Sequence, residues 1–366
     1  MTVPPTPAAR VTARQILCSL CLCSSALAFA ESRLPGQEAL RIQQQQLRAL
    51  QHLKLEQRRR QLQRSASGSR AAAPSEPALG VADEHCWPLQ GVRVSGVTLF
   101  SGLALDAQIK PFVAACMGIG QINRLLAEIT RVYVQAGYIA SRPYLSRVPS
   151  AGRTLDIEVD EGYVEAIELT DQSLPLALRT AFPGMLGAPL NLRDLEQGLE
   201  QINRLRSMDV TADIVPGSEP GASRVILRSS AAEPHWGLGL AVDNLGSSAT
   251  GRERNVISLS LDSPLQLTDS LSLSFSETLN QGPRYSRSNS LFYSVPYGYW
   301  TLSAFASHIE YRAPLKLSTA TLYGSGRTDQ FSLRADRVLW RDQSHQLSGH
   351  VQLSHKDVET RLQKAR

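Results

Sequence analysis

Asn-Val-Ile-Ser-Leu-Ser-Leu-Asp at residues 255–262 and Ser-Leu-Ser-Leu-Ser-Phe-Ser at residues 270–276 alternate between apolar and polar side chains. Successive side chains of a β-strand point to opposite faces of its sheet, so a period of two predicts strands with one apolar face. Serine fills most of the opposite face, as expected where that face meets water. These two stretches decide the fold class of the last third of the chain.

The alternation continues through the rest of this region. Further strands are predicted at 291–295, 300–306, 331–335 and 347–353. The connections alternate in length, with short turns at 263–269 and 296–298 and longer ones at 277–287 and 312–328. This pattern is typical of outer-membrane barrels. We therefore expect residues 231–366 to form the first part of an antiparallel transmembrane β-barrel, with room for about seven strands. A water-soluble β-sandwich, which also alternates, is the alternative.

The composition excludes a disordered chain and does not by itself favour a nucleic-acid-binding protein. The chain has 366 residues, of which 42% are hydrophobic, too many for a disordered protein. A formal net charge of +5 over this length gives no indication of nucleic-acid binding. After the first 30 residues no apolar run reaches about 18 residues, so no transmembrane helix is expected in the mature chain.

Two tandem α/β units are predicted before the strands, at 86–162 and 163–230. Each contains one clear amphipathic helix between strands. The apolar positions of the first helix recur at helical spacing and are Ile122, Leu125, Leu126, Ile129, Val132 and Tyr133. Those of the second helix, which Asn191 is expected to cap, are Leu192, Leu195, Leu199, Ile202 and Leu205. The shared order of elements indicates an internal repeat.

The first 85 residues divide into three segments. Arg10 and Arg14 precede an apolar run that ends in Ala28-Phe29-Ala30 and then Glu31. This is typical of a signal peptide over 1–30, cleaved between Ala30 and Glu31. Residues 31–64 are predicted to contain a helix too polar for an ordinary core. Residues 65–85 have the composition of a flexible linker.

Two cysteines, Cys86 and Cys116, remain once the signal peptide and its three cysteines are removed. An even number of cysteines in an exported chain suggests a disulfide, worth roughly 3–4 kcal/mol for a loop of about 30 residues. Two unrelated thiols are the alternative. We find no phosphate-binding loop, nucleophile elbow or zinc motif, so the sequence predicts no enzyme, no cofactor and no metal site.

The order of the segments resembles the outer-membrane transporters of two-partner secretion, the hemolysin secretion/activation and filamentous-hemagglutinin transporter family. Four local sequences are similar to motifs of that family: residues 133–139, residues 155–162, residues 263–269, and Asp243-Asn244-Leu245-Gly246 with Gly251. Cys86 and Cys116 match the paired cysteines of many first POTRA domains in the family.

The resemblance implies a mixed fold. It comprises a signal peptide (1–30), an N-terminal plug helix (31–64), a linker (65–85), POTRA 1 (86–162), POTRA 2 (163–230) and a β-barrel from 231. It implies a pore that secretes a large exoprotein across the outer membrane, with the POTRA domains in the periplasm. The expected partners are the exoprotein's N-terminal domain, outer-membrane lipid, the barrel-assembly machinery and periplasmic chaperones; nucleic acid is not expected.

About seven strands are too few to close the family's barrel, so the sequence is interpreted as C-terminally truncated and is not expected to secrete by itself. The family's conserved-loop arginine and its partner are expected beyond residue 366. Two alternatives remain. One is a POTRA-containing barrel-assembly insertase. The other is a soluble periplasmic peptide-binding module that ends in a β-sandwich.

Overall fold

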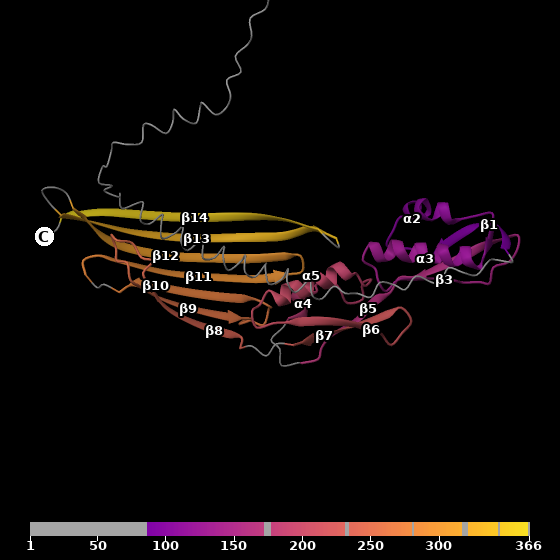
Figure 1. Ribbon diagram of the computed structural model, residues 1–366, viewed down its shortest axis with the longest axis horizontal. Coiled ribbons are helices and arrows are strands. Elements are labelled where there is room, and N and C mark those ends of the chain that lie inside the picture. The colour runs from indigo at the N-terminus through magenta and orange to yellow at the C-terminus, as the bar shows by residue number, and fades with distance from the viewer. Residues whose placement is uncertain are drawn as a thin grey trace, which may run out of the picture.

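The computed structural model describes residues 86–364, except 172–176, 231–233, 280–281, 317–320 and 343–344. Three bodies follow one another along the long axis of the molecule: two α/β units and a broad curved sheet (Figure 1). The predicted signal peptide with Ala30 and Glu31, the polar helix at 31–64 and the linker at 65–85 lie outside the described residues.

The first α/β unit packs two helices on a small mixed sheet. Its elements are β1 (Cys86–Ser95), α2 (Gly102–Ile109), the 3-10 helix η1 (Lys110–Phe112), β2 (Cys116–Gly118), α3 (Ile119–Gln135), β3 (Arg142–Leu145) and β4 (Arg153–Asp160). The strand order is β2-β1-β4-β3, with β1 parallel to β4. The apolar stripe of α3 is buried against β4, so the helix predicted from its spacing is confirmed.

The second unit repeats this plan on a three-stranded sheet. Its elements are β5 (Tyr163–Leu169), α4 (Leu178–Ala181), α5 (Leu192–Asn203), β6 (Val210–Pro216) and β7 (Ala222–Ser229). The strand order is β5-β7-β6, and β5 runs parallel to β7. Asn191 caps α5 as predicted, because its side chain accepts a hydrogen bond from the Arg193 N–H at 2.8 Å.

The third body is one antiparallel sheet in chain order. Its strands are β8 (Trp236–Asp243), β9 (Arg254–Asp262), β10 (Ser270–Thr278), β11 (Tyr285–Tyr297), β12 (Trp300–Lys316), β13 (Thr321–Arg341) and β14 (Gln346–Lys364). One face carries exposed apolar side chains, among them Leu240 (72% exposed) and Leu353 (71% exposed). The described residues from 236 onward form this one sheet, so the two-sheet sandwich considered above is wrong.

The register places like residues in rows across the strands. Leu259 of β9 lies between Leu238 of β8 and Leu273 of β10, whereas Ser258 lies opposite Ser274. A slip by one residue would move every leucine to the serine face, so the alternation fixes the pairing. Among the residues that the structure describes, no helix is both long enough and apolar enough to cross a lipid bilayer.

One predicted turn is wrong. Residues 312–328 were expected to form a long connection, but β12 runs to Lys316 and β13 begins at Thr321. The prediction depended on apolar alternation, and the apolar positions move to the opposite face between Ala306 and Ile309. The backbone ladder continues through this change, and it pairs Tyr311 with Gly326. Tyr311 is 1% exposed and needs this glycine, since a Cβ at Gly326 would lie 2.6 Å from its hydroxyl oxygen.

Candidate functional site

The connections after β9, β11 and β13 lie at one end of the strand sheet, because the strands alternate in direction. The second α/β unit precedes β8 in the chain and lies at this same end, where α5 faces the connections (Figure 1). We call this contact the joint. It is made by side chains of α5 and by residues 263–269, 298–301 and 341.

Two glutamines of α5 hold the connection between β11 and β12. The Nε2 groups of Gln197 and Gln201 both donate to the carbonyl oxygen of Gly298, at 3.3 and 3.0 Å. Gly298 in turn donates from its N–H to the Thr180 carbonyl at 2.8 Å. Both glutamines are buried, so these hydrogen bonds replace the water that each amide would otherwise bind. The connection is therefore fixed from both α4 and α5.

Arg204, at the C-terminal cap of α5, brings a partly buried positive charge to the joint. Its guanidinium donates to the Thr268 carbonyl at 2.9 Å and to the hydroxyls of Ser294 and Ser270. Burial lowers the pKa of Arg204 to about 10, against the opposing effect of Asp262 and Asp269. The group stays protonated at neutral pH, so the joint contains a positive charge that is bonded through both terminal nitrogens of the guanidinium.

A second arginine reaches the joint from the sheet. Arg341, the last residue of β13, donates to Gln197 Oε1 at 2.8 Å and to both carboxylate oxygens of Glu200. Its side chain is 11% exposed. At the other end of α5, Tyr299 donates to Asp194 Oδ1 at 2.6 Å, and burial followed by this bond raises the pKa of Tyr299. The whole length of α5 is thus bonded to the sheet.

The sequence predicted the apolar stripe of α5 and missed its polar side. Gln197, Gln201, Arg204 and Arg341 were not candidates, because polar helix residues usually face solvent. The sequence did contain a signal, because the polar side of α5 carries several long side chains that can form hydrogen bonds. This signal predicts a buried polar face only when the position of the sheet beside the helix is already known.

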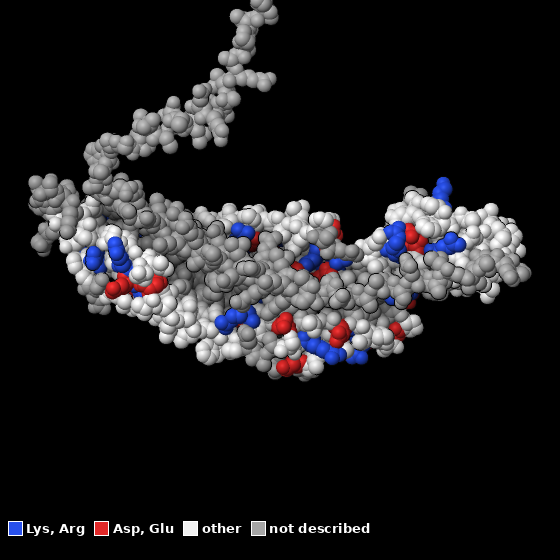
Figure 2. All heavy atoms as spheres, in the orientation of Figure 1, with Lys and Arg blue, Asp and Glu red and all other residues white. Residues whose placement is uncertain are grey.

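Charged side chains gather in mixed groups over the two α/β units and at the far end of the strand sheet (Figure 2). At that far end lie the motif residues Asp243, Asn244, Gly246 and Gly251. Asp243 accepts two hydrogen bonds from Arg254, both at 2.9 Å, and one from the Leu245 N–H. Gly246 donates to the Arg252 carbonyl at 2.8 Å, whereas the Asn244 side chain is exposed. The motif therefore builds the turn between β8 and β9.

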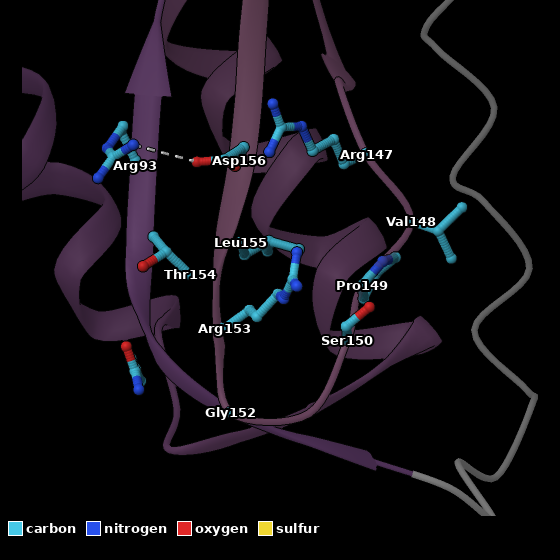
Figure 3. Close-up of a pocket in the computed structure, with 11 residues that line it drawn as sticks. Arg93, Arg147, Val148, Pro149, Ser150, Gly152, Arg153, Thr154, Leu155 and Asp156 are labelled. Carbon is cyan, nitrogen blue, oxygen red and sulfur yellow. Dashed lines mark ion pairs between the residues drawn. The ribbon is translucent and has the colours of Figure 1, made fainter.

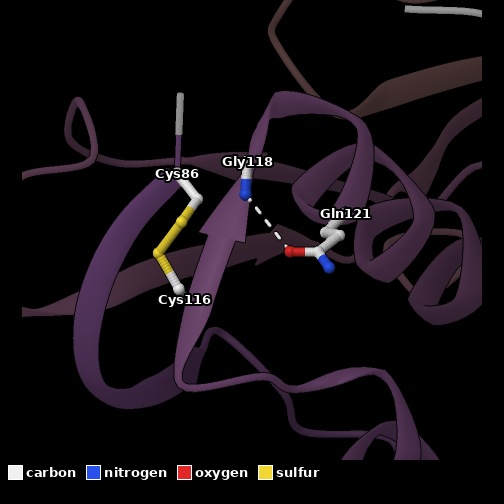
Figure 4. Close-up of a disulfide and its surroundings, with 4 residues drawn as sticks. All are labelled: Cys86, Cys116, Gly118 and Gln121. Atoms are coloured by element: carbon white, nitrogen blue, oxygen red, sulfur yellow. Dashed lines mark hydrogen bonds between the residues drawn. A yellow bond between two sulfur atoms is a disulfide. The ribbon is translucent and has the colours of Figure 1, made fainter. Parts of the chain in front are cut away.

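In the first α/β unit, the structure joins Cys86 of β1 to Cys116 of β2, with the two Cα atoms 5.5 Å apart (Figure 4). The bond lies three residues before α3, and at the start of that helix the Gln121 side chain accepts a hydrogen bond from the N–H of Gly118, the N-cap residue, at 3.3 Å. It therefore ties the start of β1 to the start of α3.

Glu161, at the end of β4, forms a second tie within this unit. Its carboxylate accepts from the N–H groups of Thr98 and Leu99 at 2.9 and 3.1 Å, and from the Tyr133 hydroxyl at 2.7 Å. Burial would raise the pKa of Glu161, but a hydrogen bond from the Thr98 hydroxyl, together with these three, outweighs it and holds the pKa below its usual value. The loop after β1, the end of α3 and the end of β4 meet at this carboxylate.

No set of three His, Cys, Asp or Glu side chains within the described ranges is placed to hold a metal ion. The chain has two successive α/β units, and the second contacts one end of an antiparallel sheet that has an exposed apolar face. This arrangement defines the class of POTRA-bearing outer-membrane β-barrel proteins. Family comparisons specify the class further. Residues 87–162 match the ShlB-type POTRA domain, residues 163–216 match a POTRA domain, and residues 221–366 match the haemolysin secretion/activation protein ShlB/FhaC/HecB.

Individual relatives agree with these matches. The chain is 38% identical over 332 residues to the hemolysin transporter protein ShlB of Serratia marcescens, covering 90% of this chain and 58% of the relative. It is 37% identical to the hemolysin transporter protein HpmB of Proteus mirabilis, covering 92% and 59%. The solved structure of CdiB from Escherichia coli superposes with a TM-score of 0.78 at 29% identity, covering 90% of this chain and 60% of that one.

The chain belongs to the haemolysin secretion/activation family of outer-membrane transporters, and its POTRA domains are periplasmic. It spans somewhat under two thirds of the length of the curated relatives it matches.

Proposed function

We propose that the protein is a pore-forming outer-membrane transporter that captures a large partner exoprotein of hemolysin or adhesin type and secretes it by two-partner secretion. The observation that carries this proposal is the joint, in which α5 of the second POTRA domain and its cap residue Arg204 are bonded to two connections of the barrel sheet and to Arg341 at the end of β13. A domain held beside the periplasmic end of a pore is suited to deliver an unfolded chain into it. The family match of residues 221–366 favours secretion over barrel assembly by an insertase.

Capture occurs at a sheet edge of the first POTRA domain. Strand β3 ends the sheet order β2-β1-β4-β3, so within the described residues one side of β3 has no strand partner. An extended segment of the exoprotein's N-terminal domain would add there through main-chain hydrogen bonds. Exposed Tyr144 on β3 supplies apolar contact area at this edge.

The segments before residue 86 complete the proposal. Residues 1–30 act as the signal peptide, with cleavage between Ala30 and Glu31, and residues 65–85 link the plug helix at 31–64 to the POTRA domains. The helix occupies the polar lumen and leaves it when the exoprotein passes. Deleting residues 37–64 should raise single-channel conductance in planar bilayers, and an unchanged conductance would place the helix elsewhere.

The remaining partners follow from the surface of the sheet. Its exposed apolar face, which includes Leu240 and Leu353, meets outer-membrane lipid, and the barrel-assembly machinery and periplasmic chaperones bring the chain there. The transporter acts without catalysis, cofactor or nucleic acid. Folding of the exoprotein outside the cell biases its movement outward.

A chimaera tests the function. Residues 1–366 are joined to the remaining barrel segment of the Serratia marcescens relative and expressed with that organism's hemolysin in a host that lacks both. We expect hemolytic activity in the medium, and none from the same chimaera without residues 86–230. A chimaera that forms a heat-modifiable barrel but leaves the hemolysin in the periplasm would contradict the proposal.

A further inference from the structure

A polar pocket of about 270 Å³ lies on the face of the first POTRA sheet that points away from its helices (Figure 3). Arg93 of β1 and Asp156 of β4 form its floor. The loop after β3 forms its wall, with Arg147 on one side, and Arg153 enters from the start of β4. The pocket takes no part in the joint, and of its lining residues Leu155 also belongs to the core of the domain.

Positive charge is in excess in this pocket. Arg93 Nη1 lies 3.7 Å from Asp156 Oδ1, which pairs one cation with the one carboxylate. The side chains of Arg147 and Arg153 have no hydrogen-bond or ion-pair partner within the part of the chain that the structure describes. Two guanidinium groups are therefore available, and this planar donor fork is suited to bind a carboxylate through two parallel hydrogen bonds.

The pocket borders the sheet edge at which capture is proposed. Arg147 is the second residue after β3, and Ser146 N still donates to the Asp156 carbonyl at 3.2 Å, which keeps the loop beside β4. Val148, next to Arg147, is 85% exposed. A strand added along β3 and continuing past Leu145 would run alongside Arg147.

Side chains of an added strand alternate between the two faces of the sheet. One set would point toward α3 and the other toward the pocket face, where Arg142, Arg147 and Arg153 are exposed. We propose that the pocket binds acidic side chains at alternate positions of the partner strand added to β3, and so selects a strand that is acidic on one face. This inference rests on the strand addition described under the proposed function and specifies its partner.

Two labelled peptides test it, Ser-Val-Glu-Ile-Glu-Val-Glu-Ser and its counterpart with glutamine at each glutamate. Their binding to the full chain in detergent micelles is measured by fluorescence anisotropy at low salt. We expect the glutamate peptide to bind about tenfold more tightly, and this preference to disappear as salt screens the charges. It should also disappear in the Arg147→Gln/Arg153→Gln variant, whose changes are on exposed side chains and leave the core intact.

Arg124→Gln is the matched control, because Arg124 is an exposed arginine of α3 that bonds only the Gly120 carbonyl of its own helix. It should retain the preference. Equal binding of the two peptides, or a preference that survives the double substitution, would overturn the inference while leaving strand addition in place. Binding of neither peptide would overturn strand addition and the inference together. Arginine-dependent binding of inorganic phosphate without any preference for the glutamate peptide would also overturn it.

Discussion

The guanidinium of Arg204 donates to the carbonyl oxygen of Thr268 across 2.9 Å, and this bond joins the second POTRA domain to the turn between β9 and β10. Thr268 is 0% exposed and Arg204 is partly buried. A charge in such a place is costly unless its donors are bonded, and the Ser294 hydroxyl takes a further one. The joint therefore depends on this one side chain more than on any exposed ion pair.

Replacing Arg204 should loosen the joint. Arg204→Met keeps most of the side-chain volume but leaves the Thr268 carbonyl without its donor, which costs about 1–3 kcal/mol for the unsatisfied group, whereas the Ser294 hydroxyl keeps its hydrogen bond to Ser270 at 3.0 Å. Spin labels at Thr211→Cys and Gln352→Cys, one on the POTRA domain and one on the sheet, report the result. Their distance distribution should be narrow in the parent and broad in the variant.

Arg228→Met is the control for this experiment. Arg228 pairs with Asp213 at 2.8 Å across β6 and β7, but both side chains are more than half exposed. Such pairs contribute roughly 0–1 kcal/mol, so the distribution should stay narrow. An equally narrow distribution in Arg204→Met would mean that the glutamines and Arg341 hold the joint without it.

The first POTRA domain should lose stability in acid through Glu161. The hydrogen bonds of its carboxylate hold the pKa of Glu161 below its value in the unfolded chain, which is about 4.3. The stabilisation is therefore complete above that unfolded value and is lost as pH falls through the lower, folded one. Urea unfolding followed by circular dichroism between pH 7 and pH 3 should show a falling unfolding free energy.

The Glu161→Gln variant should be less stable than the parent at pH 7. Its unfolding free energy should also change less as the pH falls, because the amide of glutamine carries no charge that acid can remove. Glu158→Gln, on the exposed face of β4, should keep the slope of the parent protein. If the unfolding free energy of the Glu161→Gln variant falls with pH as steeply as that of the parent, another carboxylate causes the acid sensitivity.

The disulfide predicts a second property of this domain. In exported protein that is isolated without reductant, neither Cys86 nor Cys116 should react with an alkylating reagent. Both should react after reduction. The Cys86→Ser/Cys116→Ser variant should unfold at a lower urea concentration. Its free energy of unfolding should fall by roughly 3–4 kcal/mol, as expected for a loop of about 30 residues. Full alkylation of both cysteines without reductant would show that they are free thiols.

Sequence periodicity predicted the elements whose pattern comes from one buried face. The stripe of α3 and the alternation of β9 and β10 are of this kind, because a single core or a single lipid-facing surface dictates every second or fourth residue. The parts of β12 and β13 next to their connection were missed because the apolar positions of β12 move to the other face between Ala306 and Ile309, which interrupts the alternation. The polar face of α5 was missed for a related reason: its partners come from turns about 100 residues away.

The glycines of the Asp243–Gly251 motif are required by space, which a substitution can test. A Cβ at Gly246 would collide with the Gly251 carbonyl oxygen and lie 2.6 Å from that of Arg252, and both atoms belong to the backbone. Gly246 also donates to the Arg252 carbonyl, so the turn cannot open without losing this bond. Gly246→Ala should therefore destabilise the β8–β9 hairpin by about 1–3 kcal/mol.

Hydrogen exchange of the β8 and β9 amides in detergent should then be faster in the Gly246→Ala variant than in the parent. Gly282→Ala, in the next connection at the same end, meets no atom within 4 Å and should leave that exchange unchanged. Equal exchange rates in the two variants would show that the turn tolerates the methyl group and that the motif serves another purpose.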